Sequence, residues 1–288
     1  MNSEEQWTTI IKPKTALWEI DFKELWQYKG LWSMYVKRDI ITQYKQTILG
    51  PLWFIIQPAL TTIMYMVVFG GIAGIATDGI PQPLFYLAGI CMWQYFADCL
   101  THTSSTFLSN ANIFGKVYFP RLIAPLATIT GNLVKFIIQL TLFAVVYIYF
   151  VFKGMVVAIN WYACLLPVLI LVLAGLALSF GIVISSLTTK YRDLTYLFSF
   201  LIQLWMYATP IVYPLSRVEG VVKAGINVHS LMCLNPVTPI IEAFKYGFLG
   251  EGMLDWGWLA YSFVFMIVLL TIGIMLFNKV QRSFMDTV

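Results

Sequence analysis

Six long apolar segments, separated by short polar stretches, dominate the hydrophobic pattern of the chain. A helix that crosses a bilayer needs about 20 mostly apolar residues. The segments that meet this length are Leu49–Ala73, Leu84–Leu108, Leu122–Phe152, Trp161–Leu187, Leu194–Tyr213 and Trp256–Phe277. The pattern therefore predicts an all-α integral membrane protein with six transmembrane helices. Residues 49–288 form the predicted permease domain, and residues 1–48 a predicted cytoplasmic N-terminal part.

A further apolar stretch, Pro236–Leu249, is too short to cross a bilayer and contains Pro236 and Pro239. Irregular backbone at membrane depth survives only where protein or a water-filled cavity surrounds it. This stretch therefore predicts a re-entrant or interfacial segment. It lies in the longest connection on the outer side, where it could form an outer gate beside a pathway. Pro167 is expected to kink the fourth span, because proline removes a backbone donor.

Aromatic and apolar residues recur every three or four positions before the first span. They are Trp18, Phe22, Leu25, Tyr28, Trp32 and Tyr35. This spacing places them on one face of a helix that continues to Val36. An amphipathic helix rich in aromatics is expected to lie along the membrane surface. Two roles remain open for it, a membrane anchor or part of a docking surface for a cytoplasmic partner.

Composition and charge support a membrane protein and give it an orientation. The chain is 59% hydrophobic and 11% charged, whereas soluble domains carry about 25% charged residues. Of its 18 Lys and Arg residues, 13 fall on the side of the two termini in a six-span topology, four fall on the other side, and Lys135 lies inside a span. Because basic loops stay in the cytoplasm, both termini are expected there. The N-terminus also lacks the pattern of a cleavable signal peptide.

The residue types needed for catalysis or metal binding are scarce. The two histidines, His102 and His229, are far apart, and no phosphate-binding loop of the form G-x-x-x-x-G-K-[ST] is present. The four cysteines show no C-x-x-C pair. We therefore expect no catalytic site, no metal, no bound cofactor and no nucleic-acid partner. A membrane acyl- or glycosyltransferase would require acidic or histidine residues gathered at one face, and a purely structural subunit stays possible.

Two charges, Asp98 and Lys135, lie inside predicted spans. Counted from Gly115 in the intervening loop, Asp98 is 17 residues back and Lys135 is 20 forward, so an antiparallel hairpin places them at similar depth. An isolated charge at the bilayer centre costs at least about 3 kcal/mol. We therefore expect the two side chains to form an ion pair, although either could instead face a wet pathway.

Aromatic residues make up 16% of the chain, and several lie within the spans. Sugar rings present C–H faces that stack on aromatic rings, so an aromatic-lined path would suit a carbohydrate. The candidates for such a path are Trp53, Phe54, Tyr65, Phe69, Trp93, Trp205 and Tyr207. Lipid-facing or interfacial placement is the alternative for each of them.

Four stretches resemble one known family, in the same order along the chain. They are residues 37–69, FGKVYFPRLIAP (114–125), YRDLTYLFSFLIQLWMYATPIVYP (191–214) and NPVTPIIEAFKYGFLG (235–250). They are similar to recurrent stretches of Wzm-type permeases, the membrane subunits of polysaccharide and teichoic-acid ABC exporters. An ABC export permease of the same fold that carries a drug or a lipid is the alternative. Glycosyltransferase genes next to this gene would favour the glycan.

The resemblance implies a homodimer joined to two copies of a separate ATPase subunit, which binds ATP and Mg. The implied cargo is a polysaccharide, such as an O antigen, on undecaprenyl diphosphate, moved across the bacterial inner membrane. Spans one and five of the two copies would line the channel. The elbow between spans two and three would be the coupling helix, with Asn112, Phe114, Lys116, Tyr118 and Arg121 contacting the ATPase. Charge attraction makes Lys37, Arg38 and Lys45 candidates for diphosphate contact.

Overall fold

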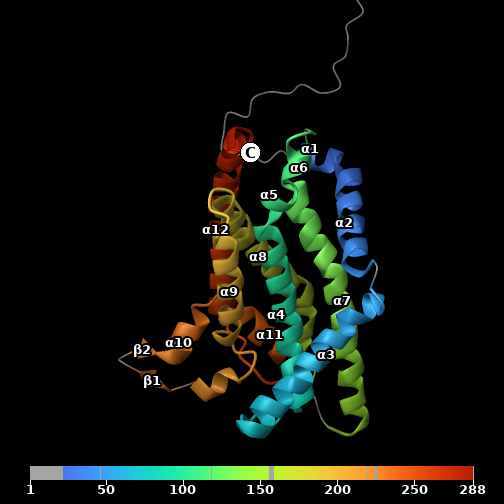
Figure 1. Ribbon diagram of the computed structural model, residues 1–288. Coiled ribbons are helices and arrows are strands. Elements are labelled where there is room, and N and C mark those ends of the chain that lie inside the picture. The colour runs from blue at the N-terminus through green and yellow to red at the C-terminus, as the bar shows by residue number, and fades with distance from the viewer. Residues whose placement is uncertain are drawn as a thin grey trace, which may run out of the picture.

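The computed structural model describes residues 22–45, 47–117, 119–155, 159–218, 220–223 and 226–287. Helices make up most of this part of the chain (Figure 1). Strands β1 (Val222–Lys223) and β2 (Ile226–Asn227) pair antiparallel in a small hairpin. Trp18 and Tyr118, which the sequence analysis singles out, lie outside the described residues.

Eight helices of the described chain have 12 or more residues, six at the predicted spans, one in the predicted amphipathic segment and one in the apolar stretch Pro236–Leu249. They are α2 (Lys29–Tyr44), α3 (Trp53–Tyr65, continued by a π-helix at Met66–Ile72), α4 (Gln82–Ser104), α7 (Ile123–Phe152), α8 (Leu166–Thr188), α9 (Leu194–Tyr207), α11 (Thr238–Leu249) and α12 (Trp256–Thr287). The shorter helices are α1 (Phe22–Gln27), α5 (Thr106–Ser109), α6 (Ala111–Phe114) and α10 (Val228–Cys233). Single 3₁₀ turns occupy Gly50–Leu52, Trp161–Leu165 and Leu215–Val218.

Four helical segments of the described chain are long and apolar enough to cross a membrane. They are Gly50–Ile72, Ile123–Phe152, Trp161–Thr188 and Trp256–Gln281, and they correspond to the first, third, fourth and sixth predicted spans. Helix α4 covers the second predicted span with 23 residues. Helix α9 covers the fifth but has 14 residues and ends at Tyr207, not at the predicted Tyr213. It stops there because Pro210 disfavours helical backbone at the residue before it.

The centre of the molecule is α4, which packs against α3, α7, α8 and α11. Its side chains from Leu84 to Trp93 are buried. Close approach between helices depends on glycine, since a Cβ at Gly181 of α8 would lie 2.5 Å from Thr103 Cβ of α4. Pro167, predicted to kink the fourth span, lies in the first turn of α8, directly after the 3₁₀ turn Trp161–Leu165. Proline is well tolerated in a first turn, where its missing N–H costs little.

The N-terminal amphipathic helix is divided into α1 and α2, and its apolar face packs on protein. Leu25 and Tyr35 join a second buried cluster with Phe114, Phe119 and Phe277. Trp32 Nε1 donates to Thr130 Oγ1 of α7 at 3.3 Å. Phe22 of the predicted face is 74% exposed, although Leu25 of the same helix α1 is buried. An exposed apolar side chain here is compatible with the predicted placement along the membrane surface.

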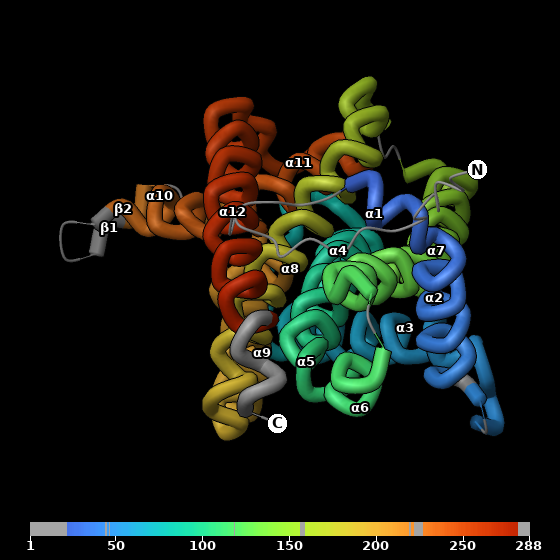
Figure 2. The backbone as a smooth tube through the Cα atoms, turned by 90° about the horizontal axis from the view of Figure 1, so that it is seen from above, coloured from blue at the N-terminus to red at the C-terminus, as the bar shows by residue number. Residues whose placement is uncertain are grey.

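The shorter helices and the hairpin are divided between two ends of the molecule. Helices α1, α5 and α6 and the C-terminal end of α12 gather at one end, whereas α10, α11 and the β1–β2 hairpin lie toward the other (Figure 1). Seen from above, α9 and α3 lie on either side of α4 and α5 (Figure 2). This arrangement leaves α3 and α9 with many large apolar side chains at the surface.

Candidate transport site

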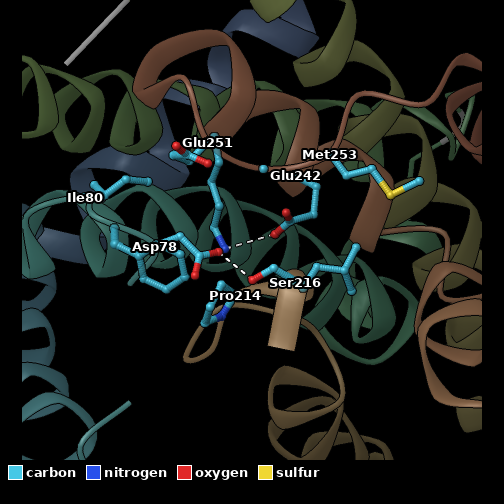
Figure 3. Close-up of a pocket in the computed structure, with 11 residues that line it drawn as sticks. Asp78, Ile80, Pro214, Ser216, Glu242, Glu251 and Met253 are labelled. Atoms are coloured by element: carbon cyan, nitrogen blue, oxygen red, sulfur yellow. Dashed lines mark hydrogen bonds and ion pairs between the residues drawn. The ribbon is translucent and has the colours of Figure 1, made fainter. Parts of the chain in front are cut away.

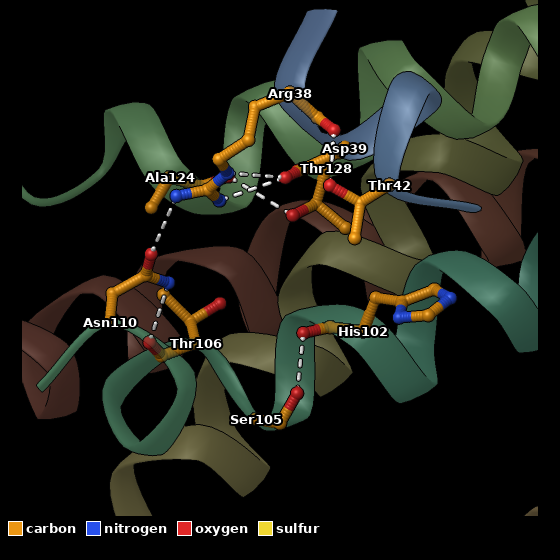
Figure 4. A network of polar contacts seen from close by, with 9 residues as sticks. All are labelled: Arg38, Asp39, Thr42, His102, Ser105, Thr106, Asn110, Ala124 and Thr128. Carbon is orange, nitrogen blue, oxygen red and sulfur yellow. Dashed lines mark hydrogen bonds and ion pairs between the residues drawn. The ribbon is translucent and has the colours of Figure 1, made fainter. Parts of the chain in front are cut away.

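A polar cavity of about 430 Å³ lies between α2, the α4–α5 segment and α7. Figure 4 shows polar contacts among side chains from these elements. Its lining is mostly polar and comprises Arg38, Asp39, Ile40, Thr42, Gln43, His102, Ser105, Thr106, Ser109, Asn110, Thr128, Gly131 and Asn132. Its volume falls within the range of about 300–1,000 Å³ that is typical of small-molecule sites.

Arg38 is the cation of this cavity. Its Nε donates to Asp39 Oδ1 at 2.9 Å, and its Nη1 donates to Asn110 Oδ1 at 3.5 Å (Figure 4). The guanidinium lies over the ring of Tyr35, 4.2 Å from its centroid. Burial raises the pKa of the Tyr35 phenol, although the Arg38 charge opposes the rise. Of the three predicted diphosphate contacts, Arg38 lines the cavity, whereas Lys37 and Lys45 are exposed outside its lining.

The far side of the cavity is built from α7. Thr128 and Asn132 lie one turn apart on this helix, so both face the same side. Thr128 Oγ1 donates to Ala124 O at 3.1 Å, and Asn132 is 4% exposed. Asn132 Oδ1 is buried with no hydrogen-bond partner among the described residues. Asn132 therefore brings to the cavity wall an acceptor without a partner in the described part of the chain, although this oxygen is itself buried and is not open to the cavity in this conformation.

Asp98 and Lys135 lie one turn farther along α4 and α7. Lys135 Nζ contacts Asp98 Oδ2 at 2.5 Å, and Gln94 Nε2 donates to Asp98 Oδ1 at 2.8 Å. Both charged side chains are mostly buried, at 16% and 17% exposed. The hairpin geometry predicts this pair, and the structure contains it. The Lys135 ammonium also lies 5.7 Å from the ring centroid of Phe54.

The candidate path aromatics divide between surface and core. Trp53 of α3 and Tyr207 of α9 are 46% and 57% exposed. Trp93 is 4% exposed, and its ring centroid lies 5.4 Å from that of Phe96. Trp93 therefore packs in the helix core of a single copy of the chain, and its predicted place on a substrate path stays a prediction. Trp205 is partly buried between Phe96 and Phe180, with centroid distances of 5.3 and 5.1 Å.

Tyr65 and Phe69 stack edge-to-face at 5.4 Å near the end of α3. Both are partly buried and pack against the core around α4. The Tyr65 hydroxyl donates to Met206 Sδ of α9 at 3.5 Å. These two aromatics therefore connect α3 to α9 within one copy of the chain.

The elbow of α5, α6 and the following loop has one face packed and one face exposed. Phe114 is buried, while Asn112 and Lys116 are exposed. Arg121 Nη1 donates to Gln281 O of α12 at 3.0 Å, and its guanidinium lies 5.5 Å from the Phe114 ring centroid. The elbow is thus fastened to the C-terminal part of α12, and a force applied to its exposed face would reach both.

A buried ion pair that the sequence pattern did not indicate lies toward the other end of the molecule, on α11. Lys245 Nζ donates to Pro210 O at 2.5 Å and to Glu242 Oε1 at 3.0 Å, and Figure 3 shows Glu242 among the residues around the neighbouring cavity. Both side chains are almost fully buried, at 1% and 3% exposed. They border a cavity of about 80 Å³ that Asp78, Ser216 and Glu251 also line. The spacing of three residues within an apolar run was the available signal.

Within the described residues, no group of three or more His, Cys, Asp or Glu side chains could hold a metal ion. The lining of the larger cavity offers no carboxylate or histidine cluster, and its one carboxylate, Asp39, is already paired with Arg38. The arrangement suits binding and release of a polar molecule.

Comparison with known proteins gives consistent matches along the chain. Residues 31–249 match the family model described as ABC-2 type transporter. The O-antigen export system permease protein RfbA of Myxococcus xanthus is 26% identical over 269 residues, covering 92% of this chain and 98% of the relative. Two proteins of the same name from Klebsiella pneumoniae are each 27% identical, covering 86% of this chain and 91% of the relative.

Proposed function

The chain belongs to the ABC-2 type transporter family, and on that basis we propose that it is the transmembrane subunit of an ATP-driven polysaccharide exporter. The cargo would be an O antigen or a similar glycan carried on undecaprenyl diphosphate. The observation that carries this proposal is the match, over 86% to 92% of the chain, to relatives named O-antigen export permeases. The resemblance of the four sequence stretches to this kind of permease is confirmed by the same matches.

In this proposal the chain spans the bacterial inner membrane six times, with both termini in the cytoplasm. Helices α4 and α9 add two crossings to the four long apolar segments, α9 together with the residues that follow it up to Tyr213, since its own 14 residues extend only about 21 Å. Helix α11 would be the re-entrant element, since its 12 residues extend only about 18 Å at 1.5 Å per residue, short of the hydrocarbon thickness of about 30 Å. The burial of α11 supports this, because a short helix at membrane depth must be surrounded by protein.

The working unit would be a homodimer of this chain with two copies of an ATPase subunit that binds ATP and Mg. The exposed apolar faces of α3 and α9 support a contact with a second copy around a shared path. Trp53 and Tyr207 are the aromatic residues best exposed for that path. The exposed Asn112 and Lys116 of the elbow would contact the ATPase, and Arg121 would pass its motion to α12.

The diphosphate of the cargo would bind near Arg38, which is the cation lining the larger cavity. A phosphate accepts paired hydrogen bonds from a guanidinium more favourably than from a single point charge. The exposed Lys37 and Lys45 would add to the positive potential at the membrane surface.

The test is to delete the gene and locate the lipid-linked glycan by fractionation and surface labelling. Accumulation of undecaprenyl-linked polymer inside the cell, with none at the surface, is the expected result. Unchanged surface glycan in a strain without a second exporter would contradict glycan export and leave a drug or lipid as the cargo.

The path itself is tested in the complemented deletion strain. Trp53→Ala, Trp205→Ala and Tyr207→Ala are expected to reduce surface glycan, whereas Trp161→Ala, at an 86% exposed position outside the proposed path, should not. Normal export by all three variants would refute the aromatic path without touching the cargo assignment.

A further inference from the structure

The cavity between α2, α4–α5 and α7 contains more hydrogen-bonding groups than a diphosphate would use. Its only formal charges are those of Arg38 and Asp39, which pair with each other at 2.8 Å. The remaining polar lining consists of hydroxyl, amide and imidazole groups. Away from this pair, a lining of neutral donors and acceptors favours an uncharged part of a ligand, one that carries hydroxyl groups.

The unsatisfied acceptor in the cavity wall points in the same direction. Asn132 is more than nine-tenths buried and lines the cavity, and its Oδ1 has no partner among the described residues. Buried acceptors without a partner are rare in native proteins, so each one requires an explanation. Because Asn132 Oδ1 is itself buried beside the cavity, a ligand hydroxyl would supply the missing donor after the amide turns toward the cavity. A cation is a poorer candidate, because the nearby carboxylate of Asp39 is already engaged by Arg38.

Polar groups next to Asn132 form with it a surface whose hydrogen-bonding groups suit the hydroxyl groups of a sugar. Thr128 Oγ1 donates to Ala124 O, which leaves its oxygen lone pairs available to accept. Asn110 donates to Thr106 O at 2.9 Å and accepts from Arg38, so it lies between the guanidinium and the neutral polar groups of the lining. Arg38 therefore marks one side of the cavity for an anion, and Thr128 and Asn132 mark another side for hydroxyl groups.

We propose that this cavity binds the sugar unit next to the lipid diphosphate, with the phosphate at Arg38 and the sugar hydroxyls at Asn110, Thr128 and Asn132. The inference rests on the proposed function and deepens it, because it assigns part of the cargo's recognition to a site inside a single copy of the chain. Recognition of this first sugar, in addition to the lipid, lets the permease distinguish a loaded carrier from an empty one.

The test measures binding to the full-length chain in lipid nanodiscs with two probes, farnesyl diphosphate and farnesyl diphosphate that carries one hexose. The wild-type chain is expected to bind the hexose-bearing probe about tenfold more tightly, since a few neutral hydrogen bonds contribute about that factor. Thr128→Val and Asn132→Leu should each reduce this ratio about three- to fivefold. Arg38→Gln should weaken both probes by a similar factor and leave the ratio unchanged.

Thr141→Val is the matched control, because Thr141 is on the same helix, is exposed, and bonds to the carbonyl four residues earlier in the same way as Thr128. It should leave the ratio unchanged. Thr128→Val changes only a hydroxyl to a methyl, so it stays informative if Asn132→Leu fails to fold. Equal wild-type affinity for both probes, or an unchanged ratio in Thr128→Val, would overturn the sugar site and leave the proposed function standing. If the wild-type chain bound neither probe, the lipid-diphosphate cargo would be refuted as well.

Discussion

Replacing Lys245 with Met should destabilise the protein by about 3–5 kcal/mol. The Lys245 ammonium is 1% exposed and is held by Glu242 Oε1, by Pro210 O and by the ring of Phe85, whose centroid lies 4.1 Å away. Removing it leaves the Glu242 carboxylate buried without its cation, and removal of one partner of a buried ion pair typically has this effect. The unpaired Pro210 carbonyl contributes about 1–3 kcal/mol of the loss.

The double variant Glu242→Met/Lys245→Met separates these contributions. It removes both charges, so the remaining loss should be close to that of the Pro210 carbonyl alone, about 1–3 kcal/mol. The double variant should therefore be more stable than Lys245→Met. The expected interaction energy between the two sites is about 2 kcal/mol, within the range for residues in direct contact.

Reversible unfolding in mixed micelles, followed by circular dichroism, measures these differences. Lys37→Met is the control, because this lysine is exposed and surface substitutions usually change stability by no more than about 0.5 kcal/mol. If the stability losses of Glu242→Met and Lys245→Met, measured separately, added up to the loss of the double variant within about 0.5 kcal/mol, the two side chains would act independently. That result would refute the buried ion pair as the source of the destabilisation.

Three further predictions follow from contacts elsewhere in the fold. The stability losses of Asp98→Asn and Lys135→Met should be non-additive, because the pair is mostly buried. In the same assay, the loss in the double variant should be about 1 kcal/mol smaller than the sum of the two single losses. Strictly additive losses would contradict a pair. Arg121→Gln removes the hydrogen bond to Gln281 O and should speed amide hydrogen exchange at the C-terminal end of α12, whereas Lys116→Gln should not. Equal exchange rates in the two variants would refute the attachment of the elbow to α12. Gly252→Ala should lower stability by more than Gly79→Ala. Both glycines have positive φ, but only a Cβ at Gly252 would meet backbone, 3.0 Å from Glu242 O. Equal losses would show that backbone strain alone determines the cost of these substitutions.

The membrane spans could be predicted because the bilayer sets their length, independent of how helices pack. The first, third, fourth and sixth spans depend only on runs of apolar residues, and the structure has a helix at each. Packing details were not available from such runs. Lipid and protein are both apolar surroundings, so the sequence could not tell that Leu25 is buried against protein while Phe22, on the same predicted face, is 74% exposed.

The parts of the candidate site that depend on neighbouring helices of one hairpin could be predicted from the sequence. Asp98 and Lys135 could be matched because an antiparallel hairpin fixes depth by counting residues. The larger cavity could not be found this way, since it combines α2, α4–α5 and α7, which are separated by long stretches of sequence. Lys245 was assigned to an outer loop because charge counting treats every basic residue outside a span as exposed, and its partner Glu242 lies three residues away in a buried helix.

The composition of α4 and its position in the fold have a common explanation. With 23 residues it has the length of a span, yet it is not among the four segments that are also apolar enough. Gln94, Asp98 and His102 lie at intervals of four, so they share one face of the helix. That face meets Lys135 and the polar cavity, while the opposite face is buried among other helices. A helix surrounded by protein does not need a lipid-compatible surface, so α4 can carry the polar groups that the outer helices cannot. The proposed ligand cavity and the intramembrane ion pair therefore both depend on the helix whose composition is least typical of a membrane span.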